Sequence, residues 1–65
     1  MQVKVNEVTL NIFKGARVKD VVMQYSHEDY QLLLRGSKVV KNHHGHRLGL
    51  GGRVLENSEL TLADR

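Results

Sequence analysis

Residues 1–13, MQVKVNEVTLNIF, decide how the rest of the chain can be arranged. Apolar and polar residues alternate through Met1–Val5 and again through Val8–Phe13, which is typical of strands with one buried face. Asn6 and Glu7 stand between the two runs, and asparagine tolerates the positive φ that a two-residue hairpin turn requires. We therefore predict that the chain opens with a β-hairpin.

Beyond Gly15 the spacing of the apolar residues changes from two to three or four. They now fall at i, i+3, i+4 and i+7, at Val18, Val21, Val22 and Tyr25. This spacing predicts a helix over Val18–Tyr25 with one apolar face. Because valine is a poor helix former, we expect this helix to be stabilised by packing against a sheet.

The second half of the chain contains further strand signals. A nearly continuous apolar run predicts a strand over Gln31–Leu34, covered on both faces. We predict a short strand at Val39–Val40, within Lys38–Lys41. The lysines on both sides of it are typical of a strand at an exposed sheet edge. Gly45–Gly52 holds four of the six glycines and predicts a loop, while alternation over Leu60–Leu62 predicts the last strand.

This order of elements predicts an α+β domain, with a mixed sheet of four or five strands packed on one helix. A chain of 65 residues forms one domain and buries only about 60% of its unfolded surface. The absence of cysteine excludes the disulfide-rich secreted class. No apolar run approaches the ~18 residues of a membrane helix, and no signal-peptide pattern opens the chain. We therefore expect a soluble, cytoplasmic protein with no membrane association.

The charges are unevenly placed along the chain, whose net charge is +3. No acidic residue lies between Tyr30 and Leu55. The basic residues of this stretch are Arg35, Lys38, Lys41, Arg47 and Arg53. Such asymmetry can attract an acidic partner, so we predict that these five residues form a partner-docking edge. Nucleic acid is a less favoured partner, because no aromatic residues are interleaved with the basic ones for base stacking.

Three segments resemble the ThiS/MoaD branch of ubiquitin-like proteins, the sulfur carriers of thiamine and molybdopterin synthesis. Met1–Asn6 resembles the opening strand of that family and its asparagine before the turn. Gly15–Val22 resembles the G-x-T-V-x-D-L-L segment that begins the family's helix, and Leu55–Leu60 resembles its turn before the last strand. The resemblance implies a single ubiquitin-like β-grasp domain over residues 1–65, without catalytic activity. The implied partner is a ThiF/MoeB-type adenylating enzyme.

The sulfur carriers of this family end in a flexible Gly-Gly tail, whereas this sequence ends in Leu62–Arg65. We therefore expect a docking domain in sulfur-transfer or thiamine-related metabolism, either as the N-terminal module of a longer protein or as a relative without the tail. One alternative is a true sulfur carrier whose tail lies outside this sequence. A second is a β-grasp nucleic-acid-binding module. Cleavage after Gly52 would remove the last strand, so we do not expect an internal Gly-Gly end.

Three other segments contain residue types found in metal, catalytic or phosphate-binding sites, but none of them forms a complete site. If His43–His46 were a strand, His44 and His46 would lie on one side of it and His43 on the other. Zinc normally has four ligands, so these two histidines alone would not complete a zinc site. Ser26–Asp29 contains the residue types of a catalytic triad, but adjacent residues cannot converge as a triad does. Gly49–Gly52 lacks the lysine and the following helix of a phosphate-binding loop. We expect no enzyme activity, no cofactor and no metal site.

Overall fold

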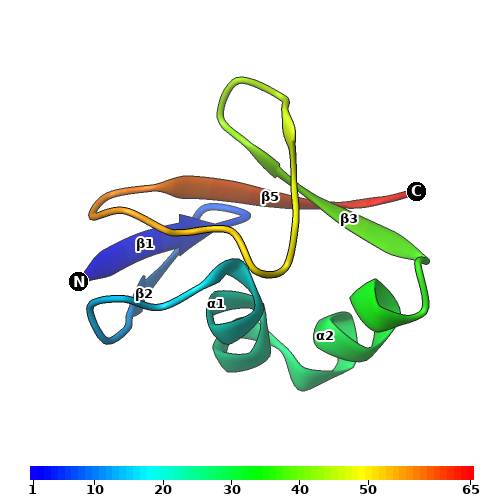
Figure 1. Ribbon diagram of the computed structural model, residues 1–65, viewed down its shortest axis with the longest axis horizontal. Coiled ribbons are helices and arrows are strands. Elements are labelled where there is room, and N and C mark those ends of the chain that lie inside the picture. Colours follow the sequence, from blue (N-terminus) through cyan, green and yellow to red (C-terminus); the bar gives the residue numbers. More distant parts are fainter.

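A computed structural model describes residues 1–65 as one mixed five-stranded sheet with two helices on one of its faces (Figure 1). The sheet order is β2-β1-β5-β3-β4. The elements in chain order are β1 (Gln2–Val5), β2 (Val8–Asn11), α1 (Val18–Tyr25), α2 (His27–Leu34), β3 (Lys38–Asn42), β4 (Arg47–Leu48) and β5 (Glu59–Asp64).

The opening hairpin forms as predicted, and β1 pairs antiparallel with β2. Asn6 and Glu7 have φ angles of 47° and 70°, the left-handed conformation that a tight hairpin turn needs. β5 then lies between β1 and β3, parallel to the first and antiparallel to the second. The two ends of the sequence are therefore hydrogen-bonded neighbours in the middle of the sheet.

The core is aliphatic and lies between the sheet and α1. The three valines predicted for the apolar face of α1 are fully buried. The core comprises eleven buried residues: Val3, Val5, Ile12, Ala16, Val18, Val21, Val22, Val40, Val54, Leu60 and Leu62. No buried side-chain polar atom lacks a hydrogen-bond partner. The domain thus depends on apolar packing, to which β1 and β5 contribute alternate residues.

The predicted strand at Gln31–Leu34 is wrong, because these residues form the second half of α2. Ser26 is the N-cap of this helix, and its Oγ accepts a hydrogen bond from the Asp29 backbone N–H at 3.2 Å. Glu28 and Asp29 place negative charge in the first turn, where the helix dipole favours it. The apolar run is not covered on both faces, since Leu34 is 55% exposed.

Two smaller expectations about the second half are also corrected. The segment Lys38–Lys41 is not at a sheet edge, because β4 covers its far side through Val40 and Lys41. The edge strands are β2 and β4. β4 itself, Arg47–Leu48, lies within the predicted glycine-rich loop. It is too short to produce a periodic signal, and only its pairing with β3 makes it a strand.

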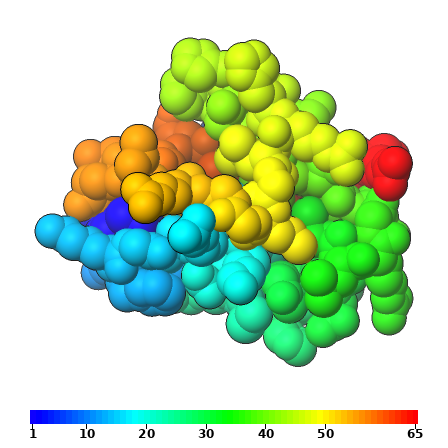
Figure 2. Space-filling view, viewed as in Figure 1, coloured from blue at the N-terminus to red at the C-terminus, as the bar shows by residue number.

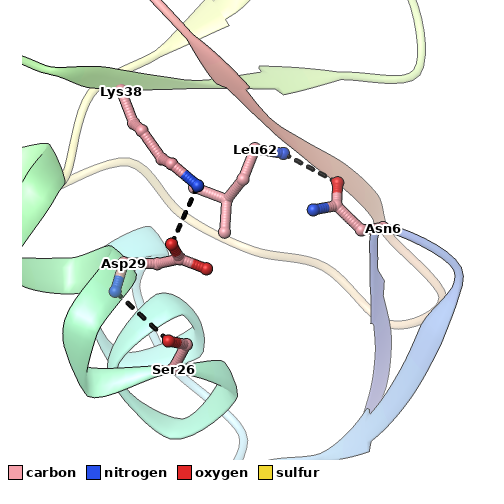
Figure 3. A network of polar contacts seen from close by, with 5 residues as sticks. All are labelled: Asn6, Ser26, Asp29, Lys38 and Leu62. Carbon is pink, nitrogen blue, oxygen red and sulfur yellow. Dashed lines mark hydrogen bonds and ion pairs between the residues drawn. The ribbon is translucent and has the colours of Figure 1, made fainter.

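Asn6 joins the hairpin turn to the last strand. Its backbone N–H donates to the Leu60 carbonyl at 3.0 Å. Its side-chain Oδ1 accepts from the Leu62 backbone N–H, also at 3.0 Å (Figure 3). The asparagine side chain therefore continues the β1–β5 ladder by one hydrogen bond beyond the end of β1.

Asn6→Ala should lower the free energy of unfolding by about 1–3 kcal/mol, because it leaves the half-buried Leu62 N–H unpaired and places alanine at positive φ. Asn6→Asp keeps an acceptor and should have a urea midpoint close to that of the unchanged protein. Asn6→Gly keeps the turn conformation but loses the acceptor, so its urea midpoint should lie between those of Asn6→Ala and Asn6→Asp. Equal midpoints for all four proteins would contradict this role.

Candidate docking surface

The sheet presents one face to the helices and the other, here called the outer face, to solvent (Figure 1). On β3, Val40 belongs to the core, so the next residue, Lys41, points to the outer face. Its partner on β4 is Arg47, and directly opposed residues of a strand pair have Cβ atoms about 4.5–5.5 Å apart. Both side chains are exposed, and neither forms an ion pair. They make a small, uncompensated positive patch.

The surroundings of this patch on β5 are small and uncharged. Thr61 lies opposite Lys41, and Ala63 is the next residue of β5 on the same face. Glu59 is the outer-face residue at the other end of β5, where it neighbours Lys4 of β1. The outer face is therefore positive at its β3–β4 end and mixed in charge at its β1 end.

Lys38 occupies a different position, on the helix-facing side of β3. Its Nζ contacts Asp29 Oδ1 at 2.9 Å, and this is the one ion pair in residues 1–65 (Figure 3). The hydrogen bond to Asp29 raises the pKa of Lys38, the charge of that carboxylate adds to the effect, and partial desolvation opposes it. The side chain thus connects β3 to the start of α2, and its charge is already matched.

The remaining two predicted docking residues are also separate from the patch. Arg35 is the C-cap of α2, at the helix-covered side. Arg53 forms an isolated β-bridge with Arg17, immediately before α1. The structure therefore brings together two of the five residues, Lys41 and Arg47. The other three lie outside this patch, at three different positions in the fold. Their docking role remains a prediction.

His43, His44 and His46 lie on the β3–β4 hairpin, which projects from the sheet (Figure 1). Asn42 shapes this turn, because its Oδ1 accepts from the backbone N–H groups of His44 and His46, both at 2.9 Å. The ring centroids of His43 and His44 are 3.9 Å apart, and those of His44 and His46 are 6.1 Å apart. Strand alternation does not apply in a turn, so the expected pairing of His44 with His46 alone is wrong. No three His, Asp or Glu side chains of the chain are placed to hold a metal ion.

Sequence reasoning missed a second basic group, in which Lys14 and Arg17 join Arg53 along one groove. The Arg17–Arg53 bridge joins distant parts of the chain, and neither partner lies in a periodic segment that would indicate the pairing. A contact of this kind has no local sequence signal.

Comparison with protein-family models, with curated proteins and with solved structures gave no match. The ThiS/MoaD resemblance therefore rests on the quoted segments. Neither α1 nor α2 has the length and apolar character needed to cross a bilayer.

Lys38 should stabilise the protein near neutral pH and lose this effect in alkali. Because its pKa is raised on folding, the contribution is fully present below the ordinary lysine value of 10.5 and disappears as the pH rises through the folded-state value. The loss of urea stability in Lys38→Met should therefore be larger near pH ~8 than near pH ~11.5.

Lys41→Met is the matched control for this experiment, since Lys41 has no ion pair and lies on the outer face. Its effect on the urea midpoint should be small at both pH values. A Lys38→Met effect that stays constant across the range would contradict the role assigned to the Lys38–Asp29 pair.

Proposed function

We propose that this chain is a ThiS-like, ubiquitin-like β-grasp domain that docks on a ThiF/MoeB-type adenylating enzyme and takes no catalytic part itself. The observation that carries the proposal is the position of β5. β-Grasp domains place their last strand in the middle of the sheet, and here β5 lies parallel to β1 between β1 and β3. The hairpin, the buried α1 and the sheet order β2-β1-β5-β3-β4 are all compatible with that arrangement.

The turns of the resembling segments give further support. Asn6, Gly15 and Asn57 each lie in one of these segments, and their φ angles are 47°, 88° and 63°. Left-handed backbone is costly for most residues but tolerated by asparagine and glycine. The residues that carry the resemblance therefore stand where the chain must turn tightly. This supports a shared fold.

The outer face is the surface that we assign to docking. Lys41 and Arg47 are exposed there without carboxylate partners, beside the small residues Thr61 and Ala63. A sheet face with a positive end suits a partner that presents carboxylates at the same place. Such pairing contributes mainly to specificity and to the rate of association, and it weakens as salt is added.

Lys41→Glu with Arg47→Glu should weaken binding to the ThiF/MoeB-type enzyme of the same organism by about tenfold or more, because like charges would face each other in the complex. Isothermal titration calorimetry measures this directly. The matched control is Lys14→Glu with Lys19→Glu, which makes the same charge change at two exposed positions outside the outer face, neither of them a predicted docking residue. That control should bind with nearly unchanged affinity.

Two negative results have different meanings. Unchanged affinity of the Lys41→Glu, Arg47→Glu variant would contradict the assignment of the outer face while leaving the partner intact. Absence of any binding by the unchanged protein would contradict the proposed function itself.

A further inference from the structure

A groove on another side of the molecule lies between the loop before α1 and the segment that leads toward β5. Figure 2 shows the dark-blue start of the chain between these two segments. We call it the Arg17–Arg53 groove. It is lined by Met1, Lys14, Gly15, Ala16, Arg17, Arg53, Val54, Leu55 and Glu56.

The two walls of the groove are connected by backbone and side-chain hydrogen bonds. Arg17 and Arg53 form a β-bridge. The Val18 N–H donates to the Gly52 carbonyl at 3.0 Å, and Arg17 Nη1 donates to the Gly51 carbonyl at 2.9 Å. These bonds join the two walls directly, so the groove is part of the fold itself, and such preorganisation lowers the cost of binding.

The groove carries more positive than negative charge. Lys14, Arg17 and Arg53 are exposed, and none of them forms an ion pair. The one carboxylate that lines the groove, Glu56, accepts a hydrogen bond from a backbone N–H of β1. Asp20, nearby on α1, accepts from the Arg17 backbone N–H at 2.9 Å. Both carboxylates keep their negative charge, but neither forms an ion pair with the three cations, so the groove and its surroundings retain a small net positive charge.

Large apolar side chains accompany these cations. Leu55, on one wall, is 71% exposed, and Phe13, which immediately precedes Lys14, is 62% exposed. Leu55 lines the groove and favours an apolar amino-acid side chain, whereas Phe13, the aromatic residue that could stack on a nucleobase, is not among the lining residues. Arginine binds carboxylates through two parallel hydrogen bonds when its donors are free. The positive charge and the exposed leucine together are complementary to a peptide that carries both carboxylates and an apolar side chain.

We propose that the Arg17–Arg53 groove binds an acidic peptide segment of a partner protein, with carboxylates at the arginines and an apolar side chain against Leu55. This site is distinct from the outer face, and the proposal does not depend on the adenylating enzyme. Lys41 and Arg47 do not line the groove. The two surfaces could therefore hold different partners at the same time.

The test is fluorescence anisotropy with a short labelled peptide in which Asp and Glu alternate with Leu. The unchanged protein should bind this peptide, and Lys14→Glu with Arg53→Glu should weaken binding at least about tenfold. Neither of these two side chains makes a hydrogen bond in the structure, so the variant should fold normally, which circular dichroism checks. Lys41→Glu with Arg47→Glu makes the same charge change on the outer face and should leave the peptide affinity unchanged.

Further probes separate the charge from the apolar contact and from other ligands. Leu55→Ser should weaken binding of the Leu-containing peptide. It should not weaken binding of a peptide in which Ser replaces Leu. No binding of the acidic peptide, or equal losses in the two double variants, would overturn the proposal. So would a single-stranded oligonucleotide that binds the groove more tightly than the peptide. Self-association that is abolished by Lys14→Glu with Arg53→Glu would assign the groove to a second copy of the chain instead.

Discussion

The pairing of the last strand with the first is the constraint on which the rest of the structure depends. β5 joins two otherwise separate units, the β1–β2 hairpin and the β3–β4 hairpin, into one sheet. Leu60 and Leu62 of β5 also complete the surface against which the valines of α1 are buried. Because valine is a poor helix former, α1 depends on this surface more than on its own propensity. Contacts between the ends of a chain are slow to form, so this pairing should also limit the rate of folding.

The same pairing creates the surfaces to which we assign function. It places alternate residues of β3, β4 and β5 on a face that no helix covers, where Lys41 and Arg47 stand together. It also fixes the segment that leads into β5 beside the loop before α1, which forms the Arg17–Arg53 groove. Both surfaces carry positive side chains, but the first has small neighbours on β5, whereas the second is a groove with an exposed leucine.

The periodic spacing of apolar residues allowed most of the fold to be predicted. The errors, at Gln31–Leu34 and at β4, fall where this spacing is absent. The hairpin, α1 and β5 each show a clear alternation or helical spacing, whereas β3 was predicted from a short apolar pair between two lysines. The apolar run that ends at Leu34 fits a buried strand as well as a helix, and the Ser26 cap was the signal that distinguishes them. The basic stretch is continuous in sequence, but strand alternation turns Lys38 to the helix side and Lys41 to the outer face. Only knowledge of the pairing could have placed Arg53 beside Arg17.

The most direct test of this account is the pattern of nuclear Overhauser effects between β1 and β5 in the isolated protein. The parallel register predicts close contacts between Lys4 and Glu59 and between Val5 and Leu60. Residues 27–34 should show the i to i+3 contacts of a helix in the same spectra. Contacts of β5 with β3 alone, with none to β1, would contradict the central position of β5 and with it the basis of the proposed fold and function.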